Sequence, residues 1–318
     1  MAADIDAASV VVAIGGNALS PPGESASVSN QFRHARESLA PIVNLALAGW
    51  RVVVVHGNGP QVGDGLLRNE VARSAVEELP LGVLVASTAG WIGYMIQQSL
   101  QNALHSAGSE RRAITVITQT LVDPEHEASR RPAKAIGHAV SEEMALSLRA
   151  QGVVVQADSR GNLRRTVPSP LPIEVLEWEV VAQLAARGDI VIAAGGGGPP
   201  VYRHPELGLE GLDAVVDKDR VASVLGNKIG ARDLLILTGV DGVYRGWGKP
   251  GAELLPRLTA GEAEALQTSG ELGVGSMGPK VEAAISFVRG GGSRAIIARL
   301  EEGQDALEGR TGTCIVAG

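Results

Sequence analysis

The stretch Val10-Val11-Val12-Ala13-Ile14-Gly15-Gly16-Asn17 joins a short apolar, mostly β-branched run to a turn that begins with two glycines. A strand that is apolar on both faces is typical of a parallel sheet covered by helices on both sides. The turn falls at the carboxyl end of this strand, where open α/β sheets bind their ligands. This stretch therefore predicts a buried parallel strand followed by a ligand loop.

The same pattern recurs along the chain, with β-branched runs alternating with longer helical stretches. Strand, glycine loop, helix and strand describe βαβ units, which predict a mainly parallel sheet with helices on both faces. We expect an α/β protein. The expected strands are 10–14, 52–56, 113–118, 190–194, 234–237, 295–298 and 313–316, and the expected helices are 31–48, 83–107, 173–187, 219–229, 260–267 and 280–289.

Residues 123–172 interrupt this alternation. They carry Pro, Arg, Ser and Gly with only brief apolar runs, such as 153–155. We interpret them as an inserted small subdomain or lid.

Composition narrows the possible partners. The formal net charge of −7 and the 3% aromatic content argue against nucleic acid, whose binding proteins favour basic stripes and aromatic stacking platforms.

Cys314 is the only cysteine, which excludes an intramolecular disulfide and fits a reducing compartment. The acidic start Met1–Asp6 does not resemble a secretory signal, so we expect a cytoplasmic protein. Residues 79–104 lack charge, but several polar side chains favour a buried or subunit-interface helix over a membrane span.

Four expected strands end in glycine-rich turns. Glycine lets backbone N–H groups approach an anion closely, and a following helix N-terminus adds a favourable dipole. Four such turns at one sheet edge favour a polyanionic ligand. The sequence contains neither a G-x-x-x-x-G-K-[ST] phosphate loop nor a G-x-G-x-x-G dinucleotide fingerprint. The turns are Gly15-Gly16-Asn17, the stretch 56–63, the glycines 195–198, and Thr238-Gly239-Val240-Asp241-Gly242.

Without a phosphate loop, other cations must hold the phosphates. The chain has five lysines, at 134, 218, 228, 249 and 280, against 23 arginines. A compact ammonium is a suitable point charge for a transferring phosphoryl oxygen. Lys218 stands between Asp217 and Asp219, and Lys280 opens an expected helix. A cation there opposes the helix dipole, so an anionic partner should compensate it.

These motifs, taken in order from Val10 to Val316, strongly resemble the carbamate kinases of the amino acid kinase fold group. The most specific parts are Asn58 with Gln61, the Asp217-Lys218-Asp219 triplet and Gly275-Ser276-Met277-Gly278-Pro279-Lys280. The sequence departs from the family pattern at Ala135, His138 and Ala139, where the family usually has prolines and an aromatic residue.

The resemblance implies a three-layer αβα sandwich around an open, mainly parallel sheet, with a protruding lid subdomain at 123–172. Residues 1–318 would form one domain, whose N-terminal half binds carbamate and whose C-terminal half binds ATP with Mg²⁺. The implied reaction is reversible phosphoryl transfer between ATP and carbamate, giving ADP and carbamoyl phosphate. The resemblance also implies a homodimer.

The resemblance further assigns site residues position by position. The implied catalytic residues are Lys134, Lys218, Lys280 and Asp219, the implied substrate-binding residues are Gly15, Gly16, Asn17, Gly57, Asn58 and Gly59, and the implied nucleotide-binding residues are Asp217, Lys218, Thr238, Asp241, Tyr244, Met277 and Lys280. The ligands of Mg²⁺ stay open, with Asp217 and Asp219 as the nearest acids. His56 is expected to have a structural hydrogen-bonding role.

Two alternatives remain at this stage. One is a kinase of the same fold acting on another small carboxylate, and the other is a non-catalytic nucleotide-binding sensor. The presence of Lys134, Lys218, Lys280 and Asp219 together disfavours the sensor, since a sensor does not need lysines for transfer. A dehydrogenase is disfavoured by the missing dinucleotide fingerprint.

Overall fold

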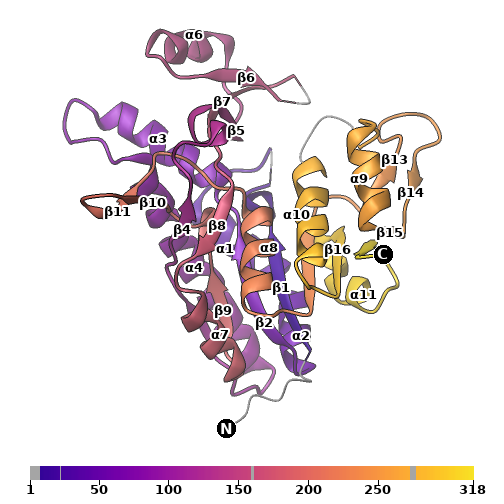
Figure 1. Ribbon diagram of the computed structural model, residues 1–318. Coiled ribbons are helices and arrows are strands. Elements are labelled where there is room, and N and C mark those ends of the chain that lie inside the picture. The colour runs from indigo at the N-terminus through magenta and orange to yellow at the C-terminus, as the bar shows by residue number, and fades with distance from the viewer. Residues whose placement is uncertain (1–7, 22, 159–160, 273–276) are drawn as a thin grey trace.

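The computed structural model describes residues 8–21, 23–158, 161–272 and 277–318 (Figure 1). Its centre is an eight-stranded sheet in the order β15-β17-β16-β12-β1-β2-β9-β3. Strands from β16 to β3 are parallel to their neighbours, whereas β17 runs antiparallel to β16. The mainly parallel α/β sheet predicted from the sequence is confirmed. The strands are β1 (Ser9–Ile14), β2 (Arg51–His56), β3 (Ala113–Thr115), β9 (Ile190–Ala193), β12 (Asp233–Thr238), β15 (Arg257–Thr259), β16 (Arg294–Arg299) and β17 (Thr313–Val316).

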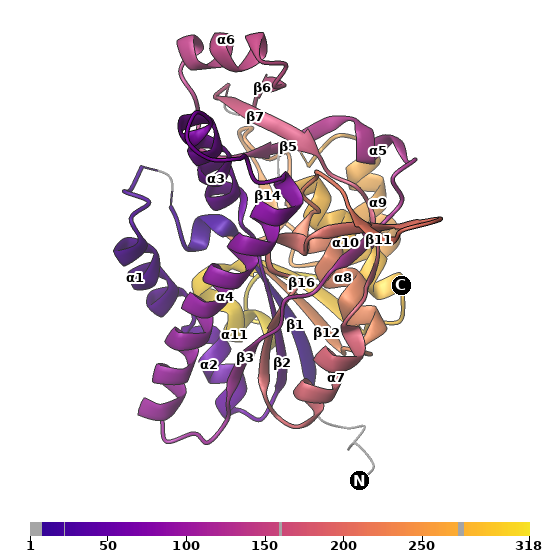
Figure 2. The ribbon, with the colours of Figure 1, turned by 90° about the vertical axis from the view of Figure 1, so that its left-hand side faces the viewer.

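Each central strand is buried on both faces, because alternate side chains enter two different cores. In β1, Val11 and Ala13 belong to one core, and Val10 and Val12 belong to the other. Figure 2 shows α1, α2 and α4 on one side of the strands, and α7 and α8 on the other. The first core also contains residues of α7 (Trp178–Ala186), α8 (Lys218–Lys228), α9 (Ala260–Thr268) and α10 (Met277–Arg289). The second contains residues of α1 (Val28–Ser38), α2 (Ala40–Leu47), α4 (Leu81–Ser106) and α11 (Gly303–Leu307).

Two helix predictions were wrong in their limits, and one helix was missed. The helix expected at 31–48 is divided into α1 and α2, since Pro41 in the first turn of α2 favours a new helix start. The helix expected at 173–187 begins as a strand, β8 (Pro172–Val175), before α7 starts at Trp178. Residues 59–63, the second part of the glycine turn predicted at 56–63, begin the helix α3 (Gly59–Ala72). The strand expected at 113–118 ends at Thr115.

Residues 123–172 contain a three-stranded antiparallel sheet that projects beyond the main sheet (Figure 1). Its outer part has a small core of its own around Ala145, Leu148 and Val155. Among the described residues, the base of this sheet has no separate core of this kind: its residues Ile136 and Val167 pack with Val62 of α3. The elements are α5 (Glu127–Arg130), β5 (Pro132–Ile136), α6 (Glu142–Ala150), β6 (Val155–Ala157) and β7 (Leu163–Pro168).

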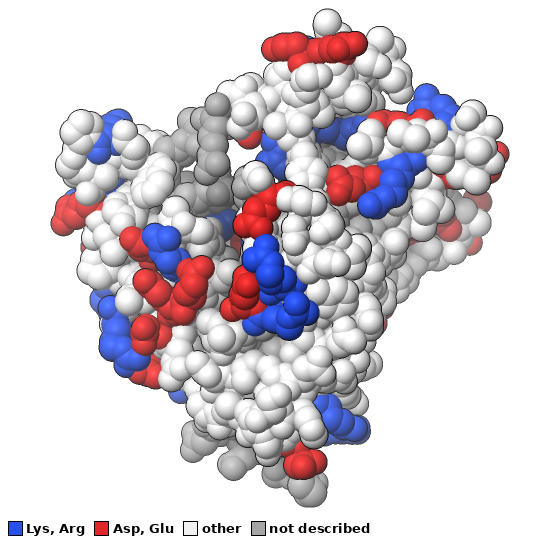
Figure 3. All heavy atoms as spheres, turned by 180° about the vertical axis from the view of Figure 1, so that it is seen from behind, with Lys and Arg blue, Asp and Glu red and all other residues white. Residues whose placement is uncertain are grey.

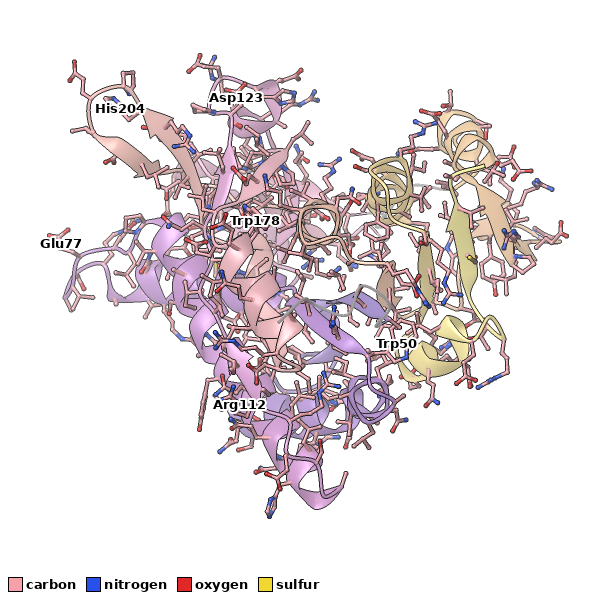
Figure 4. The ribbon with its side chains drawn as sticks, turned by 60° about the horizontal axis from the view of Figure 1, so that its bottom comes forward. Trp50, Glu77, Arg112, Asp123, Trp178 and His204 are labelled. Atoms are coloured by element: carbon pink, nitrogen blue, oxygen red, sulfur yellow. The ribbon has the colours of Figure 1, made fainter. Side chains whose placement is uncertain are left out.

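Two smaller sheets complete the fold. A four-stranded sheet joins β8 to β4 (Thr120–Val122), β10 (Pro200–His204) and β11 (Gly208–Gly211). A hairpin pairs β13 (Tyr244–Arg245) with β14 (Glu253–Leu254). In Figure 4, Trp50 and Arg112, which precede β2 and β3, lie at the end of the main sheet away from Asp123 and His204.

Basic and acidic side chains are interspersed on the face of the molecule seen in Figure 3. Within the described ranges, no helix combines the length and apolar character needed to cross a membrane.

Candidate active site

The glycine turns after β1 and β2 meet at the carboxyl edge of the sheet. A methyl group on Gly57 would lie 2.8 Å from the backbone nitrogen of Gly16 and 3.1 Å from Cδ of Lys218. A methyl group on Gly16 would lie 3.1 Å from Cδ of Pro60. Glycine is therefore required at residue 57, where two backbones and a lysine stem converge. Asn17 follows in the short 3-10 helix η1 (Gly16–Ala18), and its side chain lies outside the described part of the structure.

The turn after β9 packs closely against the turn after β2. The buried side chain of Asn58 donates a hydrogen bond from Nδ2 to Oγ1 of Thr88 at 2.9 Å. A methyl group on Gly196, whose φ is 68°, would lie 2.2 Å from Nδ2 of Asn58. A methyl group on Gly197 would lie 2.4 Å from the carbonyl oxygen of Val216. Asn58 is thus fixed from two sides, and the glycine turn reaches the residue before Asp217.

His56 lies beneath these turns as a buried neutral side chain. Burial lowers its pKa to about 4, although hydrogen bonds to the backbone of Gly57 and Ala89 oppose this shift. Its Nδ1 is 3.1 Å from the carbonyl oxygen of Gly57. A methyl group on Gly195 would lie 2.5 Å from its Nε2. This environment suits a structural support better than a proton carrier at neutral pH.

Asp217 joins the start of α8 to the projecting sheet. As the N-cap of α8, its Oδ1 accepts a hydrogen bond from the backbone N–H of Asp219 at 3.0 Å. Its Oδ2 accepts a second one from Nζ of Lys134, on β5, at 2.6 Å. Burial would raise the pKa of Asp217, but Lys134 and Lys218 outweigh it and hold this pKa far below the usual range.

Asp219 holds the other two site lysines. Nζ of Lys218 lies 2.6 Å from its Oδ1, and Nζ of Lys280 lies 3.1 Å from its Oδ2. The carboxylate side chain is only 2% exposed. Burial would raise its pKa, but the two ammonium groups lower it, so Asp219 is ionised at neutral pH. This carboxylate also supplies the anionic partner that Lys280, in the first turn of α10, needs against the helix dipole.

The cluster keeps an excess of positive charge. Lys134, Lys218 and Lys280 contribute three charges and the two aspartates subtract two, so one net positive charge remains. Burial is the main cause that lowers the pKa of Lys218, and neighbouring Lys280 adds to it. An anion entering beside Gly57 would relieve this repulsion between ammonium groups. The N-termini of α3 and α8 are the positive ends of their helix dipoles and add to this positive charge.

The remaining predicted residues form a second group at the ends of β12 and β16. Nε of Arg299 donates to Oδ1 of Asp241 at 2.7 Å, and the hydroxyl of Tyr244 donates to Oδ2 at 3.1 Å. The hydrogen bond from Arg299 is the main cause that lowers the pKa of Asp241. The ring of Tyr244 lies 5.0 Å from that of Trp247. Thr238 ends β12, on the same edge of the sheet.

Met277 begins α10 and packs partly buried against the first core. The preceding motif residues Gly275 and Ser276 lie outside the described residues.

Several residues of this edge were not singled out by the sequence reasoning. Thr88 of α4 holds Asn58, and Arg299 holds Asp241, but both contacts join segments far apart in the chain. The helix α3 was also missed, although Pro60 at its start is a usual sign of a first helical turn. Within the described residues, no group of three or more His, Cys, Asp or Glu side chains is placed to hold a metal ion.

Comparison with known families matches residues 8–299 to the model of the amino acid kinase family. The chain belongs to the amino acid kinase family. The kinase is 45% identical over 308 residues to the carbamate kinase of Halobacterium salinarum, covering 96% of this chain and 97% of the relative. It is 41% identical over 310 residues to that of Pyrococcus furiosus, covering 96% and 98%.

Solved structures give the same result for the fold. The kinase matches the carbamate kinase from Giardia lamblia bound to citric acid with a TM-score of 0.92 and 36% identity, covering 98% of this chain and 99% of that chain. The Giardia lamblia enzyme bound to AMP-PNP matches with a TM-score of 0.88 and 36% identity, over the same shares.

Proposed function

We propose that this kinase transfers phosphoryl reversibly between ATP and carbamate, giving ADP and carbamoyl phosphate. The observation that carries the proposal is the convergence of Lys134, Lys218 and Lys280 on Asp217 and the buried Asp219 beside Gly57. Relatives at about 40% identity over nearly the whole chain are named carbamate kinases, which supports this acceptor.

In this proposal, one group of residues binds carbamate and the other binds the nucleotide. Gly15, Gly16 and Asn17, together with Gly57, Asn58 and Gly59, bind carbamate and the transferring phosphoryl group. Thr238, Asp241, Tyr244 and Met277 bind the nucleotide, with Asp217, Lys218 and Lys280 at its phosphate end. The similar structure with bound AMP-PNP supports a nucleotide site in this fold.

Phosphoryl transfer requires positioning and neutralisation of charge more than covalent chemistry from the protein. Asp219 holds Lys218 and Lys280 within hydrogen-bond distance of one carboxylate, so their charges are already in place before the substrates meet. Such preorganised charge stabilises the transition state without reorganisation. Carbamate brings an anionic oxygen as the nucleophile, so the mechanism needs no general base. His56, buried and neutral, fits this absence of a proton-transfer role.

In this proposal Lys134 acts on the substrate side. Its Nζ reaches Asp217 from β5, whereas Lys218 and Lys280 meet Asp219. Asp217 keeps two backbone N–H donors from its N-cap role, at 3.0 and 3.4 Å. Both donors reach Oδ1, so Asp217 keeps its N-cap hydrogen bonds when Lys134 turns from Oδ2 toward a bound carbamoyl phosphate.

Mg²⁺ belongs to the proposal as a companion of ATP. The carboxylates at the site, Asp217 and Asp219, are each occupied by lysines, which fits an ion held mainly by phosphate oxygens and water. The ion would neutralise phosphate charge during transfer.

A coupled assay tests the proposal directly. Purified protein with ADP, Mg²⁺ and carbamoyl phosphate should produce ATP, whereas acetyl phosphate at the same concentration should be a poor donor. Faster ATP formation from acetyl phosphate would favour the same-fold kinase acting on another carboxylate. ADP binding without ATP formation from any acyl phosphate would favour the nucleotide-binding sensor.

A further inference from the structure

The base of the projecting sheet is held against α3 by an unusually close approach of two backbones. A methyl group built on Gly63 of α3 would lie 2.1 Å from Cα of Gly137 and 2.5 Å from its backbone nitrogen. Gly137 follows β5 directly and has a φ of 71°, which L side chains rarely adopt. At Gly63 any side chain would obstruct this contact, and at Gly137 glycine suits the positive φ.

A hydrogen bond, a polar contact and an ion pair surround this contact. The backbone N–H of Gly137 donates to the carbonyl oxygen of Gly59 at 2.8 Å. Gly59 is the first residue of α3 and part of the proposed phosphoryl loop. Nε2 of His138 lies 3.5 Å from Oδ1 of Asp64, and Arg165 pairs with Glu70 farther along the same helix. The projecting sheet is thereby attached along one face of α3.

The contact is coupled to Lys134 through β5. Lys134 and Ile136 are two residues apart in this strand and so share a face. Ile136 is fully buried in a cluster with Val62, the neighbour of Gly63. The distance from Lys134 to Gly137 is three residues of extended chain, roughly 10 Å. A shift of β5 at Gly137 must therefore move Lys134.

We propose that Gly63 and Gly137 form a docking seam that sets the position of Lys134 over the phosphoryl site, which makes Gly63 a positioning residue. The seam fastens the lysine-bearing strand to the same helix whose first turn binds the phosphoryl group. The base of the projecting sheet and α3 accordingly behave as one body. The outer part around Ala145 and Leu148 has a core of its own, separate from this seam. This inference rests on the proposed function for its kinetic consequences.

Gly63→Ala isolates the seam because alanine favours a helix interior over glycine. The helix itself should gain stability, while the new methyl group must push Gly137 away by about 1.5 Å to reach an ordinary contact distance. Displacement of a reacting group by this amount costs roughly a hundredfold in rate. We expect kcat/KM for carbamoyl phosphate to fall roughly 10- to 100-fold, with ADP affinity unchanged. Gly261→Ala in α9, where the methyl group meets nothing within 4 Å, is the matched control and should retain wild-type kinetics.

A double-variant cycle separates positioning from general damage. If Gly63→Ala acts through Lys134, adding it to the Lys134→Met variant should lower kcat/KM for carbamoyl phosphate by less than a further threefold, because the lysine is already gone. Full additivity of the two losses would overturn the proposal.

Amide hydrogen exchange provides a readout that does not depend on activity. Exchange of residues 132–137 and 163–168 should accelerate at least tenfold in Gly63→Ala and stay unchanged in Gly261→Ala. Unchanged exchange would refute the seam even if the wild type proved to be no carbamate kinase. If Gly63→Ala does not fold, Gly137→Ala, whose methyl group would lie 3.3 Å from Cα of Gly63, provides the same tests with smaller expected effects.

Discussion

Lys134 and Asp217 lie 83 positions apart in the chain, and Nζ of the lysine donates to Oδ2 of the aspartate at 2.6 Å. This bond joins β5 of the projecting sheet to the N-cap of α8, which begins at the next lysine, Lys218. The substrate side and the nucleotide side of the proposed cleft therefore share one carboxylate.

Lys134→Met should weaken the use of carbamoyl phosphate while leaving ADP affinity nearly unchanged. The lysine belongs to the proposed substrate side, and the proposed nucleotide contacts lie at the ends of β12 and β16. We expect a loss of roughly tenfold or more in kcat/KM for carbamoyl phosphate. Separate titrations with ADP and carbamoyl phosphate check this result. An equal loss of ADP affinity would contradict the division of the cleft into two sides.

Lys218→Ala and Lys280→Ala should each lower kcat by roughly a hundredfold or more, as expected for loss of one preorganised charge. Removal of either lysine also leaves Asp219 with only one of its two ammonium partners. Lys228→Ala is the matched control, because this lysine ends α8, pairs with Glu174 and lies over the ring of Trp178. Near-normal turnover of both site variants, with wild-type thermal unfolding, would remove these lysines from the mechanism.

His56 should make the free energy of unfolding depend on pH between about 4 and 6.5. Its folded pKa of about 4 lies below the unfolded value of 6.5, so the unfolded chain binds more protons in this window. Stability should therefore fall as pH drops from 6.5 to 4, by up to about 3 kcal/mol from this group. Urea unfolding at pH 4.5, 5.5 and 7 measures the slope.

The variant His56→Asn should flatten this pH dependence, whatever its effect on absolute stability. An asparagine amide can replace the hydrogen bond of Nδ1 to Gly57 but does not titrate. His105→Asn, at an exposed position of α4, is the control and should keep the wild-type slope. An unchanged slope in His56→Asn would assign the pH dependence to other groups.

The helix α4 should form part of a homodimer interface. Val83, Gly90 and Tyr94 lie on one face of this helix, since their spacings of seven and four residues correspond to whole turns. Val83 and Tyr94 are 47% and 56% exposed, and Ile117 adds a third exposed apolar side chain beside Gly90. Sedimentation should show a dimer at micromolar concentration, and Tyr94→Glu should shift it toward monomer. A wild-type monomer would contradict this prediction.

The sequence predicted the central sheet well because its signal is local. Strands buried on both faces must be apolar throughout, and the runs at Val10 and Val52 satisfy this condition without reference to the rest of the chain. Helix limits were predicted less well. Glycines at 59, 63 and 65 resemble a loop in sequence, but packing of Val62 and Gly65 against α4 stabilises α3 regardless.

The sequence by itself determined the parallel sheet and the glycine turns at its carboxyl edge, and it predicted the three site lysines. Only the tertiary structure decided which carboxylate each lysine meets: Asp217 for Lys134, and Asp219 for Lys218 and Lys280. It also brought Gly63 against Gly137. The reason is physical. Burial patterns repeat over a few residues, whereas these contacts depend on how β5, α3, α8 and α10 pack across long separations in the chain.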